Sequence, residues 1–228
     1  MQTLPEIILV NKPVEITSFD VIRQLRNQTG IRKFGHAGTL DPLASGLMII
    51  GVESGTKSLS QFLKLDKEYE AEIILGESRT TSDQEGELLT ECDVTSVDVV
   101  EIEAILKSLV GELELPVSAY SAIKKDGVPM YKRARKAEKN GEVVEDVPVR
   151  KMKVYEADLL DIKLCMQRKN KLILHVHFKV GSGTYVRSLA EEIGRKIGVP
   201  ACLLSLKRTK IGEFELKDAK ELNEFGKS

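Results

Sequence analysis

Strand-like segments alternate irregularly with amphipathic helical segments along this chain, and that order constrains the fold most. The segment 171–180 alternates apolar and polar residues and therefore predicts a strand with one buried face. That face carries Leu172, Leu174, Val176, Phe178 and Val180. The segment 152–164 is expected to pair with it. Further strands are expected at 6–11, 46–51, 68–76 and 203–214, and helices at 18–28, 57–65, 97–110 and 185–197.

Several of the helices have boundary signals. Thr17 or Ser18 can cap the first helix, and Gly30 stands near its end. Gly111 stops the third helix, and the sequence GVP closes the fourth. Because helices and antiparallel-looking strand neighbours are mixed, the order predicts an α+β fold with a mixed, largely antiparallel central sheet flanked by helices and loops. A doubly wound parallel sheet is disfavoured.

Composition narrows the class of protein. The chain of 228 residues shows neither repeats nor a low-complexity linker, so we expect one domain over 1–228. No apolar run is long enough to span a membrane, and the N-terminal segment is not typical of a secretory leader. Cys92, Cys165 and Cys202 lie far apart, which favours reduced thiols in a cytoplasmic protein over disulfides or a zinc site. The net charge of -1 gives no support to a nucleic-acid partner.

One segment departs from this nearly neutral composition. Residues 124–139 carry seven Lys or Arg against Asp126 and Glu138, a local charge of +5. Two interpretations stay open for it. It can be an ordinary solvated helix, or it can be a basic arm that contacts a phosphate backbone and offers Tyr131 for packing or stacking. The residues that follow, 140–151, are expected to form a loop returning to the sheet.

The segment GHAGTLDPLASG (35–46) holds an aspartate inside a rigid frame. Pro42 restricts Asp41 to an extended conformation, and the glycines permit positive φ or a close backbone approach. A carboxylate presented in this way can act as a nucleophile or a general base. The alternative is an Asp-Pro turn that caps local amides. His36 lies nearby, whereas His175 and His177 fall on the polar face of a strand and read as surface histidines rather than metal ligands.

Two glycine-containing segments could bind phosphate. The segment GSGTYVRS (181–188) runs from a strand into a helix, so Arg187 on the first turn could reach an anion, although a tight strand-to-helix connection is the simpler interpretation. A guanidinium at that position could also orient a carboxylate and keep it ionised. The segment GVESGTKS (51–58) nearly fits the P-loop pattern but has Thr56 in place of the second glycine, which disfavours a nucleotide hydrolase.

Five segments in order carry a family resemblance. They are NKPVEITSFDVI (11–22), GHAGTLDPLASGLMIIGVESGTK (35–57), LDKEYEAEIILGESRTTSDQEGE (65–87), VSAYSAIKKDGVPMYKRAR (117–135) and SGTYVRSLAEEIG (182–194). Together they resemble the bacterial TruB-type family of tRNA pseudouridine synthases, which modifies uridine 55 in the T loop. The resemblance is collinear over nearly the whole chain. It implies the pseudouridine synthase fold. Many members carry an additional C-terminal RNA-binding module, but a PUA-type module is not expected here because the sequence ends at LKDAKELNEFGKS (216–228).

The resemblance also implies roles for individual residues. Asp41 would be the nucleophile, Tyr69 would pack on the target base and take part in a later proton transfer, and Arg187 would pair with Asp41. Contacts with the RNA are implied for His36, Lys57, Tyr185, Leu206 and Arg208, and for Lys132, Arg133 and Arg135 in a clasping insertion at about 120–150.

The implied reaction is an isomerisation that begins with extrusion of the uridine from its stack. Attack by Asp41 on C6 of the base or on C1′ of the ribose stays open. No cofactor or metal is expected. We expect a monomer that acts on the T arm of tRNA. The competing hypothesis is an RNA-binding or RNA-folding protein without chemistry.

Overall fold

The computed structural model describes residues 4–121, 123–140 and 146–226, and these divide into two compact units. The first unit takes in residues 4–70, 177–182 and 205–226, and the second takes in the described residues of 71–176 and 183–204. Three strands contribute residues to both units: β4 (Lys67–Leu75), β11 (Leu172–Val180) and β12 (Ala201–Ile211). A single catalytic domain over 1–228 stays a prediction.

The first unit is built on a sheet with the strand order β14-β1-β3-β12. β1 (Ile7–Lys12) and β2 (Phe34–Ala37) each pair antiparallel with the long β3 (Ala44–Val52). β14 (Lys220–Glu221) and β12 add parallel pairs to β1 and β3, and β13 (Phe214–Glu215) pairs antiparallel with β12. Helix α1 (Ser18–Thr29), helix α2 (Leu59–Leu63) and the 3-10 turns η1 (Glu53–Ser58), η2 (Leu216–Asp218) and η3 (Leu222–Phe225) complete the unit.

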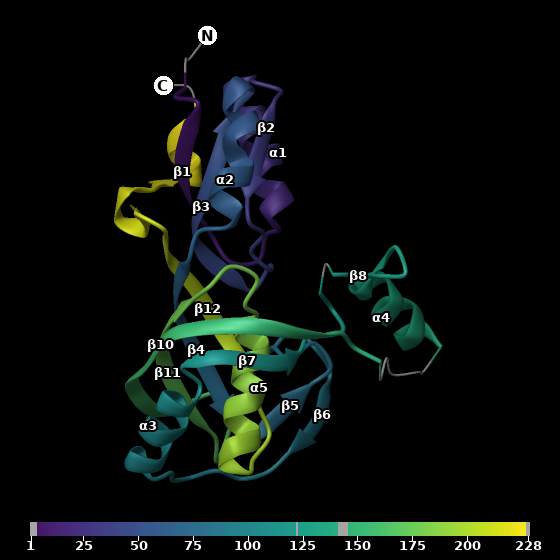
Figure 1. Ribbon diagram of the computed structural model, residues 1–228, viewed down its shortest axis with the longest axis vertical. Helices are drawn as coiled ribbons and strands as arrows, with labels where there is room; N and C mark the ends of the chain where they lie inside the picture. The colour runs from purple at the N-terminus through teal and green to yellow at the C-terminus, as the bar shows by residue number, and fades with distance from the viewer. Residues whose placement is uncertain (1–3, 122, 141–145, 227–228) are drawn as a thin grey trace. The chain divides into compact units, whose positions relative to one another are not determined.

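The second unit has the strand order β4-β11-β10-β7. β10 (Val149–Leu164) pairs antiparallel with β7 (Gly111–Pro116), as Figure 1 shows. Helix α3 (Val99–Ser108) packs against β10 and helix α5 (Val186–Ile197). Two small hairpins, β5 (Glu77–Arg79) with β6 (Leu88–Glu91) and β8 (Lys124–Lys125) with β9 (Val128–Pro129), and helix α4 (Met130–Lys139) complete it.

Local sequence signals account for most of these elements. Thr17 caps α1 with its hydroxyl, Gly30 ends the helix in the left-handed conformation, and Gly198 ends α5 in the same way. The alternating face of β11 is buried as expected. The α+β class with a mixed, largely antiparallel sheet is thus confirmed, because antiparallel pairs outnumber parallel ones in the described registers.

Some sequence expectations were wrong in detail. The expected helix 57–65 is confirmed only for α2 (Leu59–Leu63), and residues 57 and 58 belong to the 3-10 turn Glu53–Ser58. Gly55 packs closely against the backbone of Glu6, since a Cβ there would lie 2.0 Å from the carbonyl oxygen of Glu6. The glycines of the P-loop-like segment therefore serve close backbone packing. The strands β2 and β7 and the two small hairpins were not predicted.

Three further expectations concern cysteines, membranes and the basic segment. None of the described helices is long and apolar enough to cross a membrane. Cys165 and Cys202 are buried, Cys92 is half-buried, and all three are free thiols. The basic segment 124–139 forms the β8–β9 hairpin and helix α4, so its helical character is confirmed for Met130–Lys139. Of the expected return loop, residues 141–145 lie outside the described residues.

Candidate active site

Asp41 lies in a short loop of the first unit that connects β2 to β3. Its side chain is half-buried, whereas Leu40 before it and Leu43 after it are buried in the core. The backbone N–H of Ala44 donates to the carbonyl oxygen of Asp41 at 3.1 Å, which closes a turn at the start of β3. The loop is therefore anchored on both sides of the carboxylate.

Ser18 holds the residue before Asp41. Its hydroxyl donates to the carbonyl oxygen of Leu40 at 3.0 Å and accepts the Leu40 backbone N–H at 2.8 Å. Ser18 is the first residue of α1 and is buried. Because both backbone groups of Leu40 are bonded to one side chain, the N-terminal end of the Asp41 loop has little freedom to shift.

Lys12 holds the residue after Asp41. Its side chain is completely buried at the end of β1, and its ammonium group donates to the carbonyl oxygens of Pro13 (2.9 Å), Ile16 (2.7 Å) and Pro42 (3.4 Å). The carbonyl of Pro42 also accepts the backbone N–H of Glu15 at 2.8 Å. Segment 12–18 and the Asp41 loop are thus joined by a buried cation as well as by backbone bonds.

Arg208 on β12 holds the start of the same loop. Its guanidinium is buried and donates to the carbonyl oxygens of Gly38 (3.2 Å) and Leu47 (2.8 Å). Gly38 has φ +90°, a conformation that side chains other than glycine's rarely adopt. The expected contact of Arg208 with an RNA backbone stays a prediction, while its described bonds brace the loop.

His36 and Leu206 belong to the same sheet as the loop. His36 is half-buried on β2, in register with Ile50, and its Nδ1 atom is buried without a hydrogen-bond partner among the described residues. Burial, and then the charge of Arg208, lowers the pKa of His36, which favours the neutral imidazole at pH 7. Leu206 is half-buried and in register with Ala44, three residues after Asp41.

Tyr69 and Lys67 share the buried face of β4. The Lys67 ammonium donates to the carbonyl oxygens of Leu63 (2.8 Å) and Leu65 (2.5 Å), so it caps the end of α2. Burial, and then the charge of Arg208, lowers the pKa of Lys67 to about 8, against a smaller opposing effect of Asp66. Lys67 was not among the residues expected at the site.

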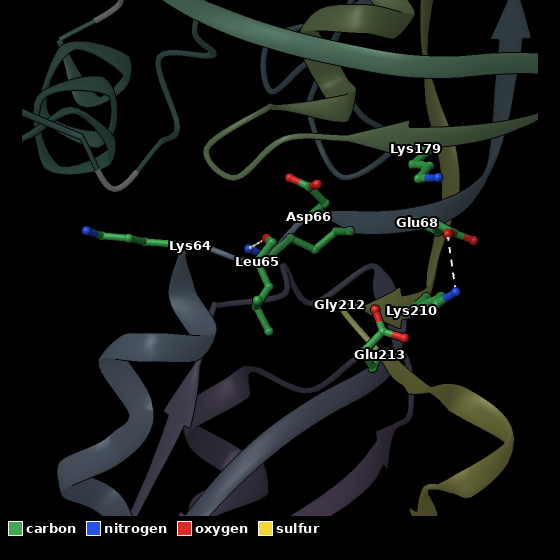
Figure 2. A pocket seen from close by; sticks show the side chains of 9 residues that line it. Lys64, Leu65, Asp66, Glu68, Lys179, Lys210, Gly212 and Glu213 are labelled. Atoms are coloured by element: carbon green, nitrogen blue, oxygen red, sulfur yellow. Dashed lines mark hydrogen bonds and ion pairs between the residues drawn. The ribbon is translucent and has the colours of Figure 1, made fainter.

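A cavity of about 350 Å³ opens beside Lys67 in the first unit (Figure 2). It is lined by Lys64, Leu65, Asp66, Lys67, Glu68, Lys179, Lys210, Gly212 and Glu213. Glu68 forms ion pairs with Lys210 at 3.8 Å and with His177 at 3.5 Å if that histidine is protonated. The lining contains both lysines and carboxylates, so its charge gives no clear preference for an anionic or a cationic ligand.

Arg187 lies on the first turn of α5 in the second unit and is buried. One of its terminal nitrogens donates to the carbonyl oxygen of Thr81 (3.0 Å) and to Asp83 Oδ2 (3.2 Å). Tyr185, two residues earlier, is half-buried and precedes the helix. Asp83 is thus an acid partner of Arg187 that the sequence analysis did not assign.

The loop that carries Asp83 is held by its own bonds. Asp83 Oδ1 accepts the Thr81 hydroxyl at 2.5 Å and the Glu85 backbone N–H at 3.1 Å. Ser82 has a left-handed φ of 63° and donates its hydroxyl to Glu191 Oε1 at 2.7 Å. Burial raises the pKa of Glu191, against the Ser82 bond and the charge of Arg187. The TSD-x-x-G sequence was the available signal for this loop.

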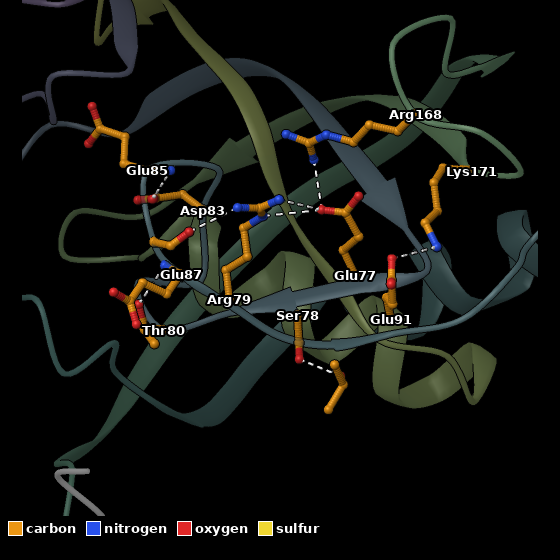
Figure 3. Close-up of polar contacts among 12 residues, drawn as sticks. Glu77, Ser78, Arg79, Thr80, Asp83, Glu85, Glu87, Glu91, Arg168 and Lys171 are labelled. Atoms are coloured by element: carbon orange, nitrogen blue, oxygen red, sulfur yellow. Dashed lines mark hydrogen bonds and ion pairs between the residues drawn. The ribbon is translucent and has the colours of Figure 1, made fainter. Parts of the chain in front are cut away.

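A buried ion-pair network supports the β5–β6 hairpin next to that loop (Figure 3). Glu77 is buried and accepts bonds from Arg79 Nη2 and Arg168 Nη1, both at 2.8 Å. Arg79 also donates to the carbonyl oxygen of Gly86 at 2.9 Å, which ties the loop to the hairpin. Cys202 is near these charges, and its burial, followed by Glu77, raises its thiol pKa to about 12, so the thiol is unreactive at pH 7.

Some basic side chains of the arm are exposed, and others bond within the arm. Lys132 and Arg135 are exposed, and the Arg135 guanidinium lies 5.8 Å from the centre of the Tyr131 ring. Arg133 is partly buried, and its Nη2 donates to the Lys125 carbonyl oxygen (2.7 Å) and to Asp126 (2.9 Å). Arg133 therefore stabilises the arm through its described contacts.

The predicted site residues fall into two groups. The first unit holds His36, Asp41, Lys57, Tyr69, Leu206 and Arg208, and the second holds Lys132, Arg133, Arg135, Tyr185 and Arg187. Lys57 is exposed on η1. Within the first unit, the structure joins the Asp41 loop to Arg208 directly and places Leu206 in register beside its C-terminal end.

Solved structures place this fold in a class. The crystal structure of the archaeal box H/ACA sRNP Nop10-Cbf5 complex matches 96% of this chain and 52% of that chain, with a TM-score of 0.66 and 25% sequence identity. The structure of an H/ACA RNP bound to a substrate RNA containing 2'-deoxyuridine matches 95% of this chain and 51% of that chain, with a TM-score of 0.66 and 24% identity. The chain spans about half the length of these solved chains and shares their fold.

Sequence comparisons identify the family within that class. The family model described as TruB family pseudouridylate synthase (N terminal domain) matches residues 26–186. The tRNA pseudouridine synthase B of Corynebacterium efficiens is 41% identical over 214 residues, covering 93% of this chain and 69% of the relative. That of Leifsonia xyli subsp. xyli is 39% identical over 219 residues, covering 95% and 70%. This chain belongs to the TruB family of pseudouridylate synthases, which are isomerases acting on RNA.

Proposed function

We propose that this protein is a tRNA pseudouridine synthase that isomerises uridine 55 in the T loop, with Asp41 as the nucleophile. The names of its relatives support tRNA as the substrate. The observation that carries the proposal is the bracing of the Asp41 loop. Ser18, Lys12 and Arg208 bond to the backbone of Leu40, Pro42 and Gly38.

Such bracing suits a carboxylate that must meet a flipped nucleoside in one geometry. Extruding a base costs a few kcal/mol, which contacts in the pocket must offset. A loop that is already ordered adds little further entropy cost when the RNA binds. The carboxylate of Asp41 attacks C6 of the uracil or C1′ of the ribose. The N1–C1′ glycosidic bond breaks and the base turns. C5 then bonds to C1′, C5 loses its proton, N1 takes up a proton, and the bond to the carboxylate breaks.

The remaining residues have supporting roles in this proposal. Tyr69 packs on the base and takes part in the proton transfer, and Arg187 orients the nucleophile while Asp83 fixes the arginine. His36, Lys57, Tyr185 and Leu206 contact the RNA around the target. A neutral His36 would recognise RNA through hydrogen bonds rather than through charge.

We further propose that the arm on α4 grips the RNA backbone and that the enzyme works as a cytoplasmic monomer without cofactor or metal. The chemistry transfers neither a hydride nor a phosphoryl group, so no such cofactor is needed. The exposed Lys132 and Arg135 supply the positive charge that a phosphate backbone attracts.

Replacing Asp41 by Asn tests the assignment. We expect Asp41→Asn to abolish pseudouridine formation at position 55 of a tRNA transcript, mapped at nucleotide resolution, while the Kd for the transcript stays within about twofold. Asp161→Asn is the matched control, because Asp161 is an exposed aspartate on β10. Wild-type activity in Asp41→Asn would refute the nucleophile. RNA binding without pseudouridine formation by the wild type would instead favour an RNA-folding role.

A further inference from the structure

Two exposed apolar residues of the first unit are chain neighbours of residues that bond to the Asp41 loop. Phe19 is 63% exposed on the first turn of α1, and Val14 is 51% exposed in the preceding segment. The buried face of α1 consists of Ser18, Val21, Ile22, Leu25 and Thr29, so Phe19 points away from the core. We call Val14 and Phe19 the apolar rim.

The rim is tied to the loop by the bonds that hold Asp41. Phe19 follows Ser18, whose hydroxyl bonds to both backbone groups of Leu40. Val14 precedes Glu15, whose N–H donates to the Pro42 carbonyl. Each rim residue is thus adjacent in the chain to a residue that is bonded to a neighbour of Asp41. The rim therefore keeps its place relative to the Asp41 backbone.

Exposure of one apolar residue would carry no argument, because scattered surface hydrophobics are normal. Here two of them flank the same anchored loop. The charges near them are mixed, since Glu15 is exposed and Asp20, the third residue of α1, forms an ion pair with the exposed Arg23 at 2.8 Å. Such a paired charge leaves little net field to attract a phosphate, whereas the face of a nucleobase is uncharged and stacks on aromatic rings.

We propose that the apolar rim receives an unpaired nucleobase of the substrate RNA, with the Phe19 ring stacked on the face of that base. The proposal rests on the proposed function and adds a binding contact to it. Extrusion of the target uridine leaves neighbouring bases without a stacking partner, and an aromatic side chain at the edge of the loop restores one. The contact binds RNA and takes no part in bond making.

Variants of Phe19 test whether an aromatic ring at this position stacks on a base. We expect Phe19→Ala to raise KM and Kd for a tRNA transcript by about tenfold, within the range of measured base–aromatic stacking. The kcat at saturating RNA should stay within about twofold, because the contact is equal in the ground and transition states. Phe19→Trp should restore binding. The slope of log Kd against log salt should not change, because no phosphate contact is lost.

Leu164→Ala is the matched control, since Leu164 is also 63% exposed but lies on β10 of the second unit. It should leave KM unchanged. An unaltered Kd for Phe19→Ala would contradict the proposal that a base stacks on Phe19. A Phe19→Trp variant that binds RNA as weakly as Phe19→Ala would also contradict it. If the wild type forms no pseudouridine, the proposed function is wrong. The comparison of Kd between the wild type and Phe19→Ala then tests the base-stacking proposal by itself.

Discussion

The buried ammonium of Lys67 should make stability depend on pH in a recognisable way. Its pKa of about 8 lies below the ordinary value of 10.5, because burial and Arg208 disfavour its charged form. Between these two pH values the unfolded chain holds a proton that the folded protein has released. The free energy of unfolding therefore rises with pH through this window, and the cost of the charge is present in full below pH 8.

Comparison with Lys67→Met isolates this contribution, since methionine does not titrate. Integrating the linkage relation over the two pKa values gives a gain of about 2.5 kcal/mol for the wild type relative to the variant between pH 7 and pH 10. The variant also leaves the Leu63 and Leu65 carbonyls without their donor, which adds a constant cost of about 1–3 kcal/mol.

Urea denaturation at pH 7, 8, 9 and 10 and constant ionic strength measures the difference. Lys64→Met is the control, because Lys64 is an exposed lysine three residues earlier. The difference between wild type and Lys67→Met should rise with pH, and the difference for Lys64→Met should change much less. A constant or falling difference for Lys67→Met would refute the reasoning.

Three other outcomes are expected. Lys12→Met should lower the free energy of unfolding by about 2 kcal/mol, because three carbonyl oxygens lose a donor. It should also slow pseudouridine formation. Urea denaturation measures the first effect and an activity assay the second. Glu77→Gln should destabilise by about 3 kcal/mol, because two arginines lose a buried counter-charge, and thermal unfolding would report it. Neutralising Lys132, Arg133 and Arg135 together should weaken RNA binding and flatten its salt dependence. Arg133 should contribute least, because it is paired with Asp126. An unchanged salt slope would contradict the proposal that the arm grips the RNA backbone.

Elements with strong local signals were predictable. Helices α1 and α5 have apolar residues at helical spacing and left-handed glycines at their ends, and β11 alternates cleanly. The segment 57–65 has helical spacing and forms helix α2 over Leu59–Leu63, but residues 57 and 58 belong to a 3-10 turn in which Gly55 lies close to the carbonyl oxygen of Glu6. Periodicity does not report such long-range packing.

The chain by itself determined the α+β class and the family motifs, because periodicity, glycine and proline act over a few residues. The resemblance carried by those motifs predicts Asp41 as the nucleophile. Only the tertiary structure decided what braces Asp41. The bonds from Ser18 to Leu40, Lys12 to Pro42 and Arg208 to Gly38 join residues 22, 30 and 170 positions apart. Side chains that distant in sequence meet only when the sheet has formed, since folding alone supplies the burial that makes such bonds strong.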